Sequence, residues 1–153
     1  MLVDRFLDSL EAFGPPWATF FGFLCTVHLA CYCCVRLAGS DELRSQPSLA
    51  AHVLPQLLGF AVLAHLGVTG WWISPAPPGT DPIGGYFFGG DRISAAMVGF
   101  QLYELVACAP CPRLRGLKGE MVFHHCVTLL LAVLAHFTPA YHFFCPMYDR
   151  GHY

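Results

Sequence analysis

The sequence predicts an all-α fold, a multispan transmembrane helical bundle of about four spans preceded by a short N-terminal interfacial helix. Of the 153 residues, 56% are hydrophobic and only 12% are charged, and the mean hydropathy is +0.53. Soluble domains carry about twice this charged fraction, because their surface must remain hydrated. Several long runs lack acidic and basic residues almost completely and approach the ~20 residues that cross a bilayer. The chain is therefore predicted to be an integral, multi-pass membrane protein.

The limits of each element follow from residues that begin or end helices. Residues 1–15 are predicted to form the interfacial helix, because apolar side chains recur there at helical spacing before Gly14, Pro15 and Pro16 break it. Acidic residues near its start exclude a secretory signal peptide. We expect the membrane domain over residues 16–144 and a polar tail over 145–153. The predicted spans are residues 17–38, 49–73, 92–109 and 120–138.

Basic residues predict how the bundle is oriented. Five of them lie on the first and third loops: Arg36, Arg44, Arg113, Arg115 and Lys118. Three lie on the other side: Arg5, Arg92 and Arg150. Because cytosolic loops carry the excess of basic residues, the first and third loops are expected to face the cytosol. The net charge of −2 and the lack of a basic stripe argue against a nucleic-acid partner.

Two adjacent histidines stand near the start of the fourth span. His124 and His125 are costly to bury in a bilayer without partners, so they are candidate catalytic residues. On a helix, Glu120 and Thr128 each lie four residues from His124 and share its face. A glutamate in that place can hold an imidazole in the tautomer that a general base needs. The alternative is that both histidines only form hydrogen bonds to neighbouring helices.

The third span carries a second group of polar residues. Gln101 and Glu104 share a helix face, whereas Tyr103 lies well round the helix and Arg92 lies near its start. A lone carboxylate inside a membrane requires a partner, and His124 or His125 is the nearest one. This group fits either a catalytic site or a set of hydrogen bonds that holds two helices together, each contributing about 1 kcal/mol to stability. We add Glu104 to the candidate catalytic residues, which are Glu104, Glu120, His124 and His125. The candidate substrate-binding residues are Arg92, Gln101, Tyr103 and Thr128.

The cysteines and the remaining histidines predict no metal site and no cofactor. Most of the eight cysteines lie in apolar runs, where a thiol behaves as a small hydrophobe. Cys108 and Cys111 are interpreted as loop residues outside the membrane. A zinc site that joins these thiols to His124 and His125 is rejected, because adjacent histidines diverge on a helix. The single histidines of the apolar runs are interpreted as core or interfacial residues: His28, His52, His65 and His136.

The order of these motifs resembles the TLC domain family of membrane proteins. Asp-Arg-Ile-Ser at residues 91–94 opens a span, and Tyr-Glu-Leu at 103–105 lies deep within it. After a basic loop follows Glu-Met-Val-Phe-His-His-Cys-Val-Thr at 120–128. The resemblance covers roughly residues 49–144, and the His-His pair with its preceding glutamate and following threonine is its most specific part. A Tyr-Glu pair stands here where many members carry Tyr-Asp.

The resemblance implies a role in lipid metabolism or membrane lipid composition. In ceramide synthases, which belong to this family, the matching His-His pair is required to transfer a fatty acyl group from acyl-CoA to a sphingoid-base amine. By resemblance, His124 and His125 would act in acyl transfer, one as base or acyl acceptor. The implied partners are membrane lipids, acyl-CoA and a sphingoid base, with further copies or other chains in a membrane oligomer. The implied location is the endoplasmic reticulum or another endomembrane, with the plasma membrane as the alternative.

Two departures from the ceramide synthases keep a non-enzymatic function open. The stretch Tyr-His-Phe-Phe-Cys-Pro at residues 141–146 lacks the carboxylates that those enzymes carry there. The chain also ends where the family continues with further spans, so we expect an incomplete copy. Smaller TLC-domain proteins tune lipid composition without an established reaction. The alternatives are therefore a lipid-binding or scaffolding protein and a truncated, inactive homologue.

Overall fold

The described part of the chain folds entirely into helices and their connections. The computed structural model describes residues 5, 9, 13–70, 86, 88–116 and 119–138, and no strand occurs among them. The four long helices are α2 (Pro16–Ala38), α4 (Pro47–Val68), α5 (Phe88–Cys108) and α7 (Glu120–Phe137). The predicted all-α fold is confirmed for these residues. The polar tail, and nearly all of the predicted interfacial helix at 1–15, lie outside the described residues.

Prolines set several helix starts, and two short helices lie within predicted loops. Pro16, Pro47 and Pro112 each occupy the first turn of a helix, where a missing N–H costs nothing. The short helices are α3 (Asp41–Ser45) and α6 (Pro112–Arg115). The side chain of Ser40 accepts a hydrogen bond from the Leu43 N–H and so caps α3. A short helix thus occupies part of each of these two predicted loops.

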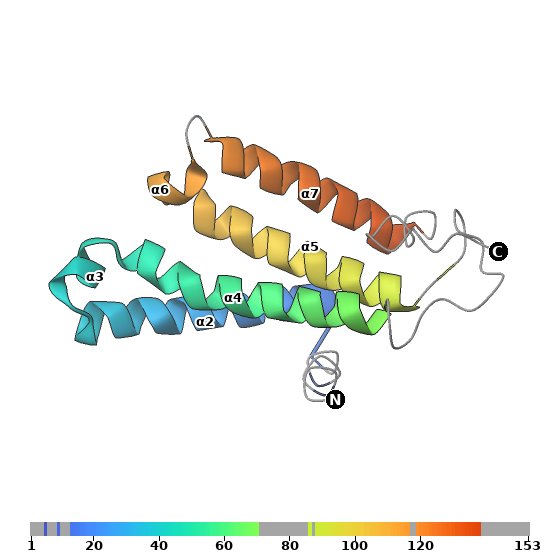
Figure 1. The fold of residues 1–153 in the computed structure, drawn as a ribbon, viewed down its shortest axis with the longest axis horizontal. Helices are drawn as coiled ribbons and strands as arrows, with labels where there is room; N and C mark the ends of the chain where they lie inside the picture. The colour runs from blue at the N-terminus through green and yellow to red at the C-terminus, as the bar shows by residue number, and fades with distance from the viewer. Residues whose placement is uncertain are drawn as a thin grey trace.

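The four long helices run alternately up and down, with α5 at the centre (Figure 1). Helix α5 packs against α2, α4 and α7, whereas α7 packs on α5 and on the short α6. The connections that contain α3 and α6 lie at the same end of the bundle (Figure 1). There the Arg113 guanidinium donates a hydrogen bond to Gln46 Oε1. The basic first and third loops therefore adjoin each other.

Three of the helices are long and apolar enough to cross a membrane: α2, α4 and α7. Helix α5 does not join them, because it carries Asp91, Arg92 and Glu104 within its 21 residues. It is also the most enclosed helix, with 13 buried residues against three in α7. The helix that is too polar to face lipid is thus shielded by the three apolar ones. The four predicted spans are confirmed only as three candidate membrane-spanning helices.

Small residues let the other helices approach α5 closely. A Cβ added at Gly99 would lie 2.5 Å from the backbone oxygen of Trp17 on α2. A Cβ at Gly59 on α4 would collide with the ring of Phe100. Where lipid replaces water, helices associate through such close packing and not through burial of apolar area alone. The glycines thus allow α2 and α4 each to pack closely against α5.

Candidate functional site: a buried polar cluster

Six polar side chains from all four long helices meet inside the bundle. Helix α5 contributes three of them, and each neighbouring helix contributes one histidine. We call them the polar cluster: Gln101, Tyr103, Glu104, His28, His52 and His125. All but His28 are buried, and Glu104 is only 1% exposed. Because three helices enclose α5, a polar residue on any of its enclosed faces contacts a neighbouring helix. A charge so deeply buried needs partners, and the cluster supplies them.

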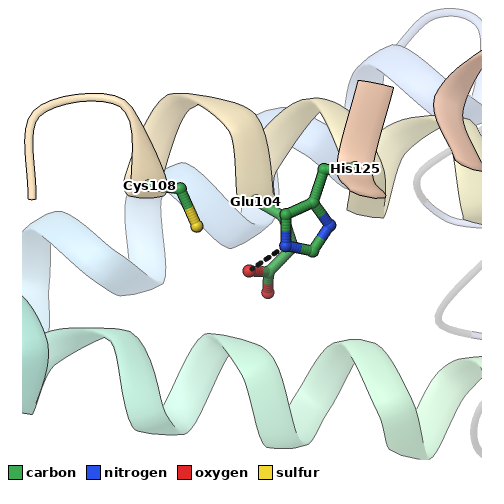
Figure 2. Close-up of side chains that lie close together, drawn as sticks. All are labelled: Glu104, Cys108 and His125. Atoms are coloured by element: carbon green, nitrogen blue, oxygen red, sulfur yellow. Dashed lines mark ion pairs between the residues drawn. The ribbon is translucent and has the colours of Figure 1, made fainter. Parts of the chain in front are cut away.

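The Glu104 carboxylate lies between two imidazoles. Its Oε2 is 3.3 Å from Nε2 of His52 and 3.7 Å from Nε2 of His125. Figure 2 shows the imidazole of His125 reaching the carboxylate from α7. The sequence predicted His124 or His125 as the partner of Glu104; the structure places His125 beside it, together with His52, which is closer and was not predicted. The second oxygen, Oε1, has no hydrogen-bond partner among the described residues.

Gln101 fixes the tautomer of His125. The Nδ1 of His125 lies 2.7 Å from Oε1 of Gln101, and an amide oxygen can only accept a hydrogen bond. Nδ1 therefore carries the proton, and Nε2 of the neutral ring keeps its lone pair. The amide nitrogen of Gln101 in turn contacts Sδ of Met97 at 3.4 Å, which orients the carbonyl toward the histidine. Within the described chain, Nε2 of His125 has no hydrogen-bond partner.

Tyr103 joins two histidines on the other side of Glu104. Its hydroxyl lies 2.9 Å from Nδ1 of His28 and 2.9 Å from Nδ1 of His52. Because Nε2 of His52 faces a carboxylate, its proton belongs on Nε2, and Nδ1 accepts from the tyrosine hydroxyl. The tyrosine oxygen then accepts from Nδ1–H of His28. A directed series of polar contacts thus runs from His28 to Glu104 and connects α2, α4 and α5.

Cys108 also lies next to the cluster. The sequence interpretation placed its thiol in a loop, and this was wrong. Cys108 is the last residue of α5 and is 2% exposed, because the helix extends to it before the prolines of the next turn. Its Sγ, a Glu104 carboxylate oxygen and an imidazole nitrogen of His125 all lie within 4.8 Å of one another (Figure 2). Cys111 is only half-buried and does not belong to this group.

The remaining predicted site residues lie apart from the cluster. Glu120 and His124 are exposed on α7, and no hydrogen bond or ion pair joins them in the described structure. The His124 ring makes an edge contact with His125, with 5.3 Å between ring centroids. Thr128 donates its hydroxyl to the backbone oxygen of His124. Arg92 lies over the ring of Phe88, twelve residues or about 18 Å along α5 from Glu104.

A separate ion pair joins the other ends of α5 and α7. Nδ1 of His136 lies 2.9 Å from Oδ1 of Asp91, and the Tyr86 hydroxyl donates to Oδ2 of the same carboxylate at 3.3 Å. The sequence interpretation treated His136 as a core or interfacial histidine and did not foresee this partner. The contact fixes how α7 lies along α5, at a distance from the polar cluster.

Sequence reasoning missed two members of the polar cluster, His28 and His52. Neither stands beside another histidine in its apolar run, and such isolated histidines usually form hydrogen bonds within a core. The sequence did contain one indication that further partners exist, namely the three polar residues on α5. Three buried polar groups on one helix require partners from more than one neighbouring helix. Comparisons with protein-family models, with curated proteins and with solved structures found no match for this chain.

Proposed function

We propose that this chain is a four-span membrane protein of the TLC domain type that acts in lipid metabolism, with α5 as a span in addition to α2, α4 and α7. Its proposed reaction transfers a fatty acyl group from acyl-CoA to the amine of a sphingoid base. The observation that carries the proposal is the position of His125, whose lone-pair nitrogen lies 3.7 Å from the buried Glu104 carboxylate. The His-His motif of the resemblance supports the reaction class, and endomembranes are the proposed location.

The residues around His125 fit the role of a general base. The amine nitrogen attacks the thioester carbonyl, the new C–N bond forms and the C–S bond breaks. Nε2 of His125 accepts the amine proton and then returns a proton to the departing CoA thiolate. The nearby Glu104 carboxylate stabilises the imidazolium that forms in between, and Gln101 holds Nδ1–H in place. His124 is exposed and is assigned no proton transfer.

The depth of the cluster suits a donor that arrives from the cytosol. Glu104 lies four residues from the end of α5, which is about 6 Å along the helix. That end carries the short helix α6 with its two arginines (Figure 1). If this end is cytosolic, as the basic residues predict, a water-soluble acyl-CoA reaches the site without crossing the bilayer. The sphingoid base enters from the membrane.

The test compares two adjacent histidines in the full chain. Membranes that contain the wild type, His125→Gln or His124→Gln are supplied with acyl-CoA and sphingoid base, and N-acyl product is measured by mass spectrometry. We expect His125→Gln to lose about 10²–10⁴-fold in rate and His124→Gln to stay close to wild type. The proposal fails if the wild type makes no more product than membranes without the protein, or if both variants match the wild type.

A second candidate function is a non-enzymatic lipid-binding or scaffolding protein. The Tyr103 hydroxyl favours it, because this group is bonded to His28 and His52 and ties three helices together. In that case the protein co-purifies with lipid and changes membrane lipid profiles, and no variant of the cluster alters a turnover rate. Lipid analysis of the purified wild type and of cells with and without the protein separates this function from acyl transfer.

A further inference from the structure

We propose that Glu104, Cys108 and His125 bind a zinc ion through a carboxylate oxygen, a thiolate and an imidazole nitrogen. Ligand atoms of the three residues lie within 4.8 Å of one another, and all three residues are buried. Glu104 and Cys108 stand one turn apart on α5, and His125 reaches them from α7 (Figure 2). The inference goes beyond the proposed acyl transfer and does not depend on it.

Two unpartnered atoms indicate that a cation belongs here. Glu104 Oε1 and His125 Nε2 have no hydrogen-bond partner among the described residues. The two residues are 1% and 7% exposed, so bulk water does not solvate these atoms. Since Gln101 Oε1 accepts a hydrogen bond from Nδ1–H of His125, the lone pair on Nε2 faces the Glu104 carboxylate. A positive ion between them satisfies both electron-rich atoms at once.

The surrounding contacts already orient the ligands. Gln101 accepts the Nδ1–H of His125, which is the usual outer contact of a metal-bound histidine. His52 lies against Oε2 of Glu104 and leaves Oε1 available for a metal. The imidazole of His125 and the carboxylate of Glu104 are therefore each held by a neighbouring side chain.

The donor set favours zinc over other common ions. Zinc accepts sulfur, nitrogen and oxygen ligands at about 2.0–2.3 Å, which places ligand atoms about 3.5 Å apart in a tetrahedron. Shifts of about 1 Å from the observed separations produce that arrangement. Magnesium and calcium prefer oxygen ligands alone. Zinc with one carboxylate and one thiolate carries no net charge, which suits the interior of a membrane bundle.

Zinc binding alters the state of two groups. Cys108 gives its thiol proton to water when the Zn–S bond forms. Nε2 of His125 becomes a ligand and no longer accepts a proton, so the zinc-bound and base forms are alternative states of one site. Three protein ligands leave a fourth position for a water or substrate oxygen.

The test measures zinc content of the full chain in lipid nanodiscs, purified through a tag without histidines. The protein is stripped with a chelator, incubated with zinc alone, separated from free metal and analysed by mass spectrometry for metals. We expect one zinc ion per wild-type chain and loss of most of it in Glu104→Gln, Cys108→Ser and His125→Gln. The matched controls, Cys111→Ser and His124→Gln, are expected to keep it.

Cobalt substitution gives a second measurement of the same site. Bound cobalt is expected to show a thiolate-to-metal charge-transfer band that disappears in Cys108→Ser and persists in Cys111→Ser. Circular dichroism confirms that each variant keeps its helices. The inference is overturned if the wild type retains no zinc, or if the cluster variants and their controls lose it equally. Zinc content is read without acyl-CoA, so a chain that binds zinc but makes no product contradicts only the proposed reaction.

Discussion

Nδ1 of His125 lies 2.7 Å from the side-chain oxygen of Gln101, and this contact decides which nitrogen of the histidine is available for chemistry. The two residues come from different helices, α7 and α5, and both are buried. Because the amide oxygen accepts a hydrogen bond from Nδ1–H, the lone pair of Nε2 is directed toward Glu104. The general-base reaction and the zinc site both require this tautomer.

Replacing Gln101 by leucine should weaken zinc binding. The change removes the acceptor that holds Nδ1–H, so the ring can rotate or adopt the other tautomer. We expect zinc affinity to fall about 10–100-fold, as for other outer contacts of metal-bound histidines. Competition with a zinc-binding dye measures this affinity. Gln56→Leu on α4, where the side chain is half-buried and outside the polar cluster, is the control; equal affinities in both variants would contradict the role of Gln101.

Tyr103→Phe should destabilise the bundle. Its hydroxyl serves Nδ1 of both His28 and His52, so the change leaves polar atoms without a partner in the bundle. The expected loss in the free energy of unfolding is about 1–3 kcal/mol. Reversible unfolding in mixed micelles, followed by circular dichroism, measures it. Tyr32→Phe on α2, whose hydroxyl forms no hydrogen bond with the described residues, should stay within about 0.5 kcal/mol of wild type.

Gly99→Ala should separate α2 from α5. The added Cβ would lie 2.5 Å from the backbone oxygen of Trp17, so one helix must shift. Overpacking of this kind costs about 1–3 kcal/mol. The same unfolding measurement applies, with Gly22→Ala as the control, because a Cβ there meets nothing within 4 Å. A wild-type stability for Gly99→Ala would show that α2 and α5 are not in close contact at this point.

Asp91 and His136 should show an energetic coupling. Their side chains are 28% and 17% exposed, so their ion pair is partly screened by solvent. We expect a coupling energy of about 1 kcal/mol from a double-mutant cycle with alanine at both positions. Additive effects of the two substitutions would mean that the pair does not hold α5 and α7 together.

The sequence predicted the helices well because helix formation in a membrane depends on local properties. Runs free of charge and the prolines at their ends are visible in the chain itself. The expected spans 17–38, 49–73, 92–109 and 120–138 overlap α2, α4, α5 and α7, and residues 71–73 of the second span lie outside the described residues. A partner for Glu104 was expected from His124 or His125, since a buried carboxylate must find one, but the sequence did not distinguish the two histidines and did not indicate His52.

Tertiary packing alone decided the composition of the site. His28 and His52 carry no local mark of function, and only the enclosure of α5 by three helices brings them to Tyr103 and Glu104. The same packing turns His125 inward and leaves His124 exposed, because adjacent residues on a helix point about 100° apart. The sequence by itself determined an all-helical, membrane-type chain whose apolar helices contain polar residues that are unfavourable to bury without partners. The arrangement of helices determined which of those residues meet, since contacts between helices depend on distances that no single segment contains.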